Sequence, residues 1–391
     1  MSIVPFQSDL VPAVEAFNQR LEAGGSEHQF PTRLTMDCWP GEGATRDPDE
    51  AALRLDRSGF IWFERYLLLQ GSEAALPDRP AVRGAYILIR QRAIVSGEVI
   101  EVQFLKLPVS EGIVNPKFSM VGVALLCDAF KRAPNMFALG MGNLQNPLPR
   151  LLETLGARLR PVPFLFRVLR ASRFLRHIQP LRSTPGRARL LDFAARMHLG
   201  DIPLAAYNHW QSRRRPATSA LRAEVVPGFG AWADDLWSRH KQHFSFACCR
   251  AAGESNHRFP AHDTRLVRLA VRLGDRVIGW AALTDSQFEH NKFFGAMRVG
   301  AIADCMAEPG QEAAVAWLAS QHLEERGVDL IVTNQGHRGW RNALLDCGFR
   351  EGPSNFILAT PPGLEKRIAA GDPAFERVHI NRGDGDGPIH L

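Results

Sequence analysis

Val114-Asn115-Pro116-Lys117-Phe118-Ser119-Met120-Val121-Gly122-Val123-Ala124-Leu125-Leu126 is the stretch that decides the fold. An apolar run ends at Val114, Pro116 turns the chain, and apolar residues at helical spacing follow. The pattern predicts a strand, a tight loop and the start of a helix. A helix start directs backbone N–H groups and the positive end of the helix dipole at one point, so it holds a phosphate without a charged side chain. Gly122 and Ala124 are small enough to let a phosphate approach.

This stretch resembles the loop that binds coenzyme A in the GNAT-type acyl-CoA acyltransferases. In that family a strand ends in Val-x-Pro, and Arg/Gln-x-x-Gly-x-Gly/Ala opens a helix whose amides take the pyrophosphate. Val114-x-Pro116 and Ser119-x-x-Gly122-x-Ala124 fall in this register, with Ser119 where the family usually has Arg or Gln. The alternative interpretation is ordinary packing of a strand against a helix. The resemblance implies acyl-CoA or acetyl-CoA as the donor, bound by Val114, Ser119, Met120, Val121, Gly122, Val123 and Ala124.

Length and composition indicate an ordinary folded protein with two domains. Its 391 residues exceed the usual size of a single core, and 45% of them are hydrophobic and 23% charged. No apolar run approaches the roughly 18 residues of a membrane span, and residues 1–6 lack the basic start of a secretion signal. We therefore expect a cytoplasmic protein without a transmembrane segment. The cysteines lack metal-like CxxC spacing, so we expect free buried thiols and no metal site.

The expected elements recur in the same order along the chain. The first copy has strands at 81–96 and 99–107, the quoted loop and helix, a strand at 136–140, a helix at 147–155 and a strand at 162–169. The second has strands at 266–273, 277–284 and 296–305, a helix at 311–326, a strand at 329–333, a helix at 340–346 and a last strand at 355–359. Residues 31–50 are expected to form a loop. Two degenerate copies of one unit explain this order better than one large sheet.

This order, and the ending Leu345-Asp346-Cys347-Gly348-Phe349, are similar to the GNAT pattern, in which a helix stops at Gly-Phe before the final strand. The resemblance implies an α+β fold with α/β-type layers: two GNAT-like domains, each with a mixed, mostly antiparallel central sheet flanked by helices. We place an N-terminal domain at residues 1–168, a basic helical linker at 169–222 and a C-terminal domain at 223–391. Two such halves also resemble, more distantly, the FemAB-type transferases, which use aminoacyl-tRNA.

Much of the net charge of +6 lies between Arg150 and Arg189, and within it residues 164–189 form an amphipathic basic stretch with apolar residues among the arginines. The simplest interpretation is a helix between the domains with a solvated basic face. The alternatives are peripheral contact with an acidic membrane surface and binding of an anionic glycan or RNA, although one local patch does not favour a nucleic-acid partner. Near the other end, residues 382–387 have the acid spacing of a calcium loop's start but lack its later ligand, so we expect a disordered polar tail.

The implied reaction needs a base that deprotonates an ammonium, an amine that attacks the thioester, and a backbone amide that holds the oxyanion. Glu111, close to the quoted loop, and Glu101, further back, are candidate bases in the first copy. Asp304 lies inside an apolar run near the end of a second-copy strand, and His290 precedes that strand. The structural alternatives are exposed carboxylates for Glu101 and Glu111, an ion pair for Asp304 and a solvated loop for His290.

The acid of the implied reaction is often a tyrosine, which would correspond to about Leu152 and Leu344, and neither side chain donates a proton. Asn291 and Asn334 are candidate contacts for the substrate, with a helix cap as the alternative for Asn334. The second copy of the loop, at 307–312, carries two glutamates that repel a phosphate. The first half is therefore the better donor site.

These features predict an N-acyltransferase that moves an acyl group from acyl-CoA to an amine acceptor. The acceptor class is a small molecule, a glycan precursor or a peptide. The alternatives are a FemAB-like transferase that depends on aminoacyl-tRNA and a GNAT-like module that binds without catalysing.

Overall fold

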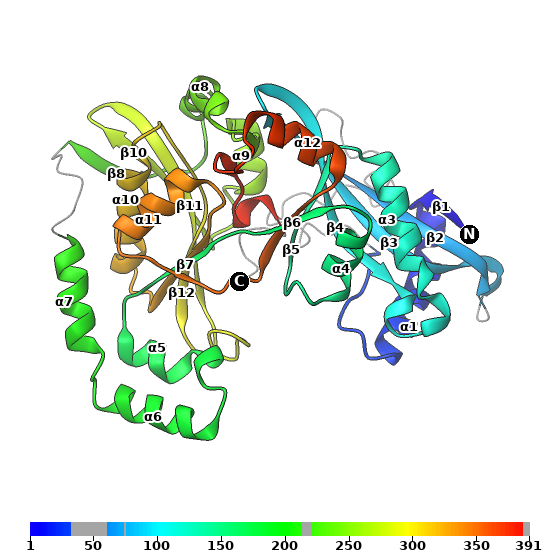
Figure 1. Ribbon diagram of the computed structural model, residues 1–391, viewed down its shortest axis with the longest axis horizontal. Coiled ribbons are helices and arrows are strands. Elements are labelled where there is room, and N and C mark those ends of the chain that lie inside the picture. Colours follow the sequence, from blue (N-terminus) through cyan, green and yellow to red (C-terminus); the bar gives the residue numbers. More distant parts are fainter. Residues whose placement is uncertain (33–60, 74–75, 213–219, 386–391) are drawn as a thin grey trace. The chain divides into compact units, whose positions relative to one another are not determined.

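The computed structural model describes residues 1–32, 61–73, 76–212 and 220–385, and the loop expected at 31–50 lies almost entirely outside them. The chain forms two compact units (Figure 1). Unit 1 comprises residues 1–161 and 355–373, and unit 2 comprises residues 162–354 and 374–391. Each unit is built around its own sheet.

The sheet of unit 1 is antiparallel except for one parallel pair at its centre, β4 and β5. The long strands β2 to β4 are rich in β-branched and aromatic residues, which favour a pleated and partly buried surface. Its strands, in spatial order, are β1 (Ser2–Pro5), β2 (Ile61–Glu73), β3 (Leu76–Val95), β4 (Glu98–Ser110), β5 (Met136–Met141), β15 (Phe356–Thr360) and β6 (Arg158–Pro161).

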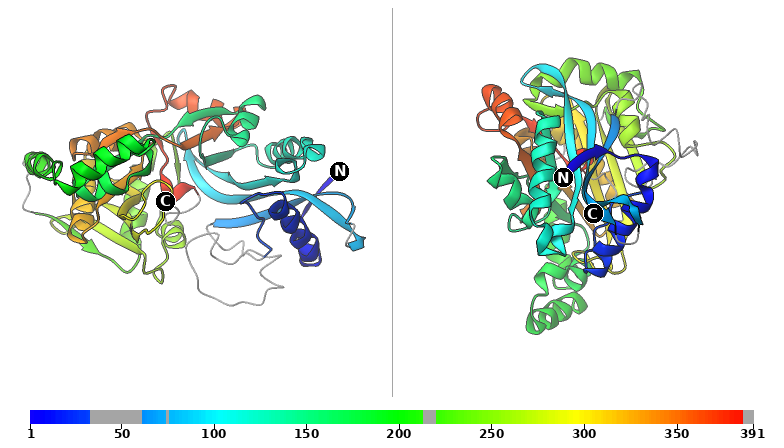
Figure 2. Two further views of the ribbon diagram at one scale, coloured as in Figure 1. Left: turned by 90° about the horizontal axis from the view of Figure 1, so that it is seen from below. Right: turned by 90° about the vertical axis from the view of Figure 1, so that its right-hand side faces the viewer.

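Helices cover both faces of this sheet, with α1 (Val11–Ala23) and α3 (Met120–Arg132) on opposite sides (Figure 2). The apolar stripe of α3 includes Val121 and Leu125, which pack on Leu88 and Leu105 of the strands. Two further helices are α4 (Pro147–Thr154), which ends before Gly156 at φ 91°, and α12 (Pro362–Gly371), which packs beside β15. The first-copy elements expected between residues 81 and 155 are thus present in this unit.

The sheet of unit 2 repeats the same arrangement, again with one parallel pair, β12 and β13. Its strands, in spatial order, are β8 (Leu221–Val225), β10 (Leu266–Leu273), β11 (Arg276–Gln287), β12 (Arg298–Ala307), β13 (Leu330–Asn334), β7 (Phe164–Val168) and β14 (Arg350–Gly352). The order matches that of unit 1 strand by strand. The predicted fold class, with mixed and mostly antiparallel sheets flanked by helices, is therefore confirmed.

Helix α10 (Glu312–Glu325) covers one face of the unit 2 sheet, where Val315 and Leu323 join a core with Leu283. On the other face, Trp280 packs against Phe229, with 4.8 Å between the ring centroids. The remaining elements of unit 2 are α5 (Ala171–His177), α6 (Pro185–Arg196), α7 (Asp201–Ser212), α8 (Ala231–His240), β9 (Phe246–Cys248), α9 (Ala252–Arg258), α11 (Arg338–Asp346) and β16 (Val378–His379).

Strand pairing differs from a simple tandem repeat at two places. β15 follows the second repeat in the chain, yet it lies between β5 and β6 in the sheet of unit 1. β7 follows the first repeat, yet it lies between β13 and β14 in the sheet of unit 2. Each repeat therefore supplies the strand that completes the sheet of the other. The units consequently differ from the expected ranges 1–168 and 223–391 at these strands.

Two other segments differ from expectation. The basic stretch 164–189 is not one helix: its first residues form β7, and Pro180 and Pro185 separate the short helix α5 from α6. These helices and α7 belong to unit 2, in the range expected to be a linker. The expected disordered tail is also wrong for residues 382–385, because Gly383 and Asp384 are buried in unit 2.

Candidate functional site

The parallel strands of unit 1 separate soon after they pair. β4 and β5 are in register only at Gln103–Met136 and Phe104–Phe137, and beyond that point they no longer pair with each other, although β4 stays paired with β3 and β5 with β15. A register shift between β3 and β4 marks a bulge in this region, where Leu107 has φ 48°. On the other side of the divergence Met141 has φ 64°. Left-handed backbone at non-glycine residues is costly and is enriched at functional sites, and here it occurs on both diverging strands.

The start of α3 follows directly from the bulged end of β4. The amide of Ser119 donates to the Pro116 carbonyl at 3.1 Å, and the turn at Pro116–Phe118 leads directly into α3. Ser119 is exposed, and its side chain makes no capping bond to the helix. The N–H groups of a helix's first turn and the positive end of its dipole attract an anion. This end of α3 is therefore able to bind a phosphate group.

Two glycines shape this helix start in different ways. At Gly122 an added Cβ would lie 3.5 Å from Leu151 and 3.9 Å from Ser110, which is ordinary contact. At Gly112 an added Cβ would lie 2.6 Å from the Phe118 carbonyl oxygen, so this turn tolerates only glycine without a shift. Gly122 has no side chain to cover the neighbouring amides, and Gly112 allows the loop to pack closely against the helix start.

Four other residues expected to bind the donor, Val114, Val121, Val123 and Ala124, are buried or half-buried. Val114 packs against the end of α1, because a Cβ at Gly24 would overlap its side chain. The Val121 side chain is buried in the core, and Val123 and Ala124 are half-buried in the first turn of α3. Binding here would therefore depend on main-chain N–H groups rather than on these side chains.

Glu111 lies beside this loop as a buried, paired carboxylate. It accepts hydrogen bonds from Arg83 at 3.0 Å and from Arg20 at 3.2 Å. These two ion pairs join the loop to β3 and α1. Glu101 is paired with Arg90 at 2.5 Å. The geometry of both carboxylates fits ion pairing.

In unit 2 the corresponding divergence is filled by the chain's own C-terminal segment, residues 378–385. β12 and β13 pair at three positions, from Val299–Leu330 to Ala301–Val332, and then separate. Gln335, just after β13, bridges to Asn381 of that segment. His379 hydrogen-bonds to the Cys305 carbonyl at 2.8 Å, so the segment is tied to both strands.

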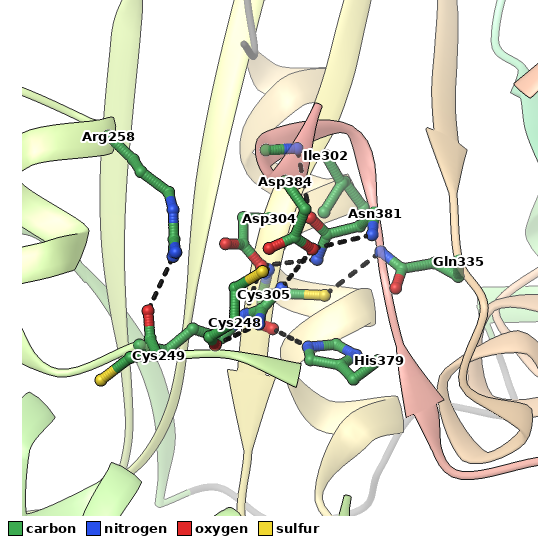
Figure 3. A network of polar contacts seen from close by, with 12 residues as sticks. Cys248, Cys249, Arg258, Ile302, Asp304, Cys305, Gln335, His379, Asn381 and Asp384 are labelled. Atoms are coloured by element: carbon green, nitrogen blue, oxygen red, sulfur yellow. Dashed lines mark hydrogen bonds and ion pairs between the residues drawn. The ribbon is translucent and has the colours of Figure 1, made fainter. Parts of the chain in front are cut away.

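Asp304 is part of the buried polar network that holds this segment (Figure 3). Its carboxylate accepts from Arg250 at 2.9 Å and from Asn381 at 2.5 Å, and Arg250 also binds Asp384 at 2.7 Å. Burial raises the pKa of the Asp304 carboxyl, and the charge of Arg250 opposes that rise. A Cβ on Gly383 would lie 3.1 Å from the Asp304 side chain, so the segment leaves no room for a ligand there.

The remaining candidates of the second half do not assemble around Asp304. His290 and Asn291 lie in the turn between β11 and β12, at the opposite end of β12. Asn291 accepts from the Phe293 and Phe294 amides, at 2.8 Å and 3.1 Å, and so closes this turn. Asn334 is buried at the end of β13, and its Nδ2 lies 3.4 Å from the Val162 carbonyl oxygen.

The second loop carries its negative charges as expected, but with partners. Glu308 is nearly buried and accepts from Arg239 at 3.0 Å and from Arg276 at 2.6 Å. The amide of Gln311 donates to the Glu308 carbonyl, and Glu312 is the first residue of α10. A phosphate at this helix start would meet these carboxylates, which disfavour its binding.

Sequence reasoning missed several residues that define these two regions. The left-handed Leu107 gives no signal in the sequence, because a leucine in a strand normally has extended backbone. Arg250, His379 and Asn381 are scattered polar residues whose convergence depends on the path of the C-terminal segment. The only sequence signal at Asp384 is the acid spacing that resembles a calcium loop, and its carboxylate binds Arg250 instead.

Comparisons with known proteins find similarity of structure without similarity of sequence. No protein-family model matches the sequence, and no curated protein matches it significantly. Saccharomyces cerevisiae N-myristoyltransferase with bound myristoyl-CoA is similar at 10% identity and a TM-score of 0.48, over 92% of this chain and 82% of that one. A probable N-acyltransferase from Enterococcus faecalis matches at 8% identity and a TM-score of 0.48, over 93% and 73% of the two chains.

A third solved structure, a GCN5-related N-acetyltransferase from Anabaena variabilis, matches at 9% identity and a TM-score of 0.45. It covers 75% of this chain and 62% of its own. The strand order and the central parallel pair of each unit agree with the GNAT-like fold that the sequence implies. The more specific FemAB-like architecture stays a prediction.

Two general features of the described residues complete the picture. None of their helices combines the length and the hydropathy needed to cross a bilayer. Their cysteines are free thiols, and they contain no cluster of three metal-binding side chains.

Proposed function

We propose that the chain is an N-acyltransferase that takes its acyl group from acyl-CoA bound to unit 1. The observation that carries the proposal is the exposed start of α3, at Ser119 and Met120, which follows the bulged end of β4. The pyrophosphate of coenzyme A would accept from the amides of residues 120–122. The unpaired edges of β4 and β5 beyond Phe104 and Phe137 offer main-chain groups to the amides of the pantetheine arm.

The proposed reaction forms one amide bond and breaks one thioester bond. The neutral amine attacks the thioester carbonyl carbon, the C–S bond breaks, and the leaving thiolate takes a proton to give free coenzyme A. A backbone N–H in the bulge of β4 would stabilise the oxyanion, because such a group is fixed before the reaction. Leu152 stands near the place of the family's tyrosine acid and is buried, so the proton of the thiolate would come from water or from the acceptor.

Unit 1 is preferred over unit 2 because its divergent strands are accessible. Leu107 and Pro108 on β4, and Gly140 and Met141 on β5, are half exposed in the described residues. The equivalent ends of β12 and β13 are buried throughout, under residues 378–385. We propose that the acceptor is an amine on a small molecule, a glycan precursor or a peptide.

The test compares two substitutions at one position. Gly122→Glu places a carboxylate beside the amides, and it should lower acyl-CoA affinity at least about tenfold, measured by calorimetry with coenzyme A, acetyl-CoA and long-chain acyl-CoAs. Gly122→Ala should bind like the wild type and gain about 0.5–1 kcal/mol of stability, since alanine is the better helix former. Absence of binding to the wild type, or equal binding by both variants, would refute the donor site.

Turnover is a separate measurement. Release of free thiol from acyl-CoA should depend on an added amine and should be lost in Gly122→Glu. Tight binding without amine-dependent thiol release across a broad amine panel would favour the non-catalytic module instead.

A further inference from the structure

Helix α6 presents its large apolar side chains to solvent instead of to the protein. Leu190, Phe193 and Met197 follow one another at spacings of three and four residues, so they lie on one face of the helix. Their exposed fractions are 66%, 57% and 56%. The inward side carries a small residue, Ala195, which is fully buried. This reverses the usual arrangement, in which a surface helix buries its large apolar face.

Exposed apolar residues continue beyond the helix. Leu199, in the turn after α6, is 57% exposed, and Ile202, at the start of α7, is 81% exposed. In Figure 1, α6 lies on the outer side of α5, away from the sheet of unit 2. A run of large apolar side chains of this kind on a protein surface marks a site of interaction.

Arginines flank the apolar face on both sides. Arg189 and Arg196, seven residues apart, lie along one edge, and Arg187 lies toward the other. All three are exposed and form no ion pair among the described residues. The one acid of α6, Asp192, is paired with Arg182 at 2.8 Å. The outer surface of this helix therefore combines an apolar centre with uncompensated positive charge.

The helix is held so that this face stays outward. Arg182 binds Asp192 and also donates to the Leu175 carbonyl of α5 at 3.2 Å. On the other side of α6, Asp201 accepts from the Ser172 hydroxyl at 2.7 Å and lies 2.6 Å from His198 Nδ1. Both ends of α6 are thus tied to α5.

We propose that α6 docks the protein onto an anionic lipid bilayer, with Leu190, Phe193 and Met197 inserted into the interface. An apolar stripe edged by arginines is the pattern of helices that lie in the plane of a membrane surface. The arginine stems reach outward and place their charges at the level of the lipid phosphates. A second copy of the chain fits less well, because two such faces would bring their arginines together. This surface does not depend on the proposed acyl transfer.

The experiment is flotation of the full-length protein with phosphatidylcholine vesicles, prepared with and without phosphatidylglycerol. We expect binding to the anionic vesicles that weakens as salt is raised. Arg189→Gln and Arg196→Gln should each lower the partition coefficient by about fivefold, which corresponds to about 1 kcal/mol per charge. Phe193→Ser should lower it by about tenfold or more. These side chains are exposed, so circular dichroism should be unchanged.

Matched controls lie on β8 of the same unit. Val225→Ser removes an apolar side chain that is 60% exposed, and Arg222→Gln removes an exposed arginine. Both should bind vesicles like the wild type. The proposal is overturned if the wild type does not float with anionic vesicles, or if the α6 variants and the controls behave alike. Self-association in the absence of lipid that Phe193→Ser abolishes would assign the face to a second copy and would also overturn it.

Discussion

Glu111 shows how burial and partners decide between two roles for one carboxylate. Its side chain is 4% exposed, and it faces Arg20 and Arg83, which are 25% and 17% exposed. We predict that Glu111→Gln lowers the free energy of unfolding by about 2 kcal/mol, because two partly buried guanidinium groups lose their counter-charge. Denaturant titration measures this loss. At saturating acyl-CoA and amine, kcat should fall less than tenfold.

The control for Glu111→Gln is an exposed pair in the same unit. Glu98 binds Arg367 at 2.8 Å with 71% of its side chain exposed, so Glu98→Gln should change stability by less than about 0.5 kcal/mol. If Glu111→Gln instead left stability unchanged and reduced kcat a hundredfold or more, Glu111 would be the base after all.

Among elements, the loop between β4 and α3 depends on one close approach. A Cβ at Gly112 would meet the Phe118 carbonyl oxygen at 2.6 Å and the Ser119 Cα at 2.9 Å. Because these are backbone atoms, they move only if the loop moves. We predict that Gly112→Ala costs about 1–3 kcal/mol and also weakens acyl-CoA binding, since it displaces the start of α3. Calorimetry and denaturant titration measure the two effects, and Gly186→Ala, in open space on α6, is the control.

The C-terminal segment that fills unit 2 should make its stability depend on pH. Burial, with Arg250 and His337 nearby, holds the pKa of His379 well below its usual value. The unfolded chain therefore binds a proton below about pH 6.5 that the folded chain does not bind. The contribution of His379 to the free energy of unfolding is fully present above that pH. Below it, the free energy of unfolding falls by up to about 1.4 kcal/mol per pH unit for one proton.

The measurement is the thermal unfolding temperature of unit 2 in the full-length protein, recorded at several pH values from neutral to mildly acidic. His379→Gln should flatten part of the decline, while His243→Gln, which alters an exposed histidine, should leave it unchanged. Equal pH dependence in the wild type and both variants would contradict the role of His379.

The spacing of apolar residues and the residues that end helices predicted most elements of the two repeats, because both signals lie within a few residues of each other in the sequence. Gly156 and Gly348, for example, end helices with φ 91° and 88°. The same signals did not predict which strands β7 and β15 pair with. A short apolar strand fits either sheet, and its own sequence does not specify its hydrogen-bond partners. The proposed anion site at α3 could be predicted from the sequence because the loop and the helix start are adjacent in the chain. The network around Asp304 could not, because it depends on residues 378–385 returning to β12.

For the whole molecule, the exchanged strands mean that neither repeat can fold from its own contiguous sequence. A fragment of residues 1–168 would lack β15, which pairs with β5 at Leu358–Leu139 and with β6 at Leu358–Arg160. Without it, both strands would expose unpaired edges and apolar side chains. We predict that this fragment is unfolded or aggregated by circular dichroism and size-exclusion chromatography. A chain that joins residues 1–161 to 355–373 through a flexible linker should fold cooperatively, and equal folding of both fragments would show that β15 is dispensable.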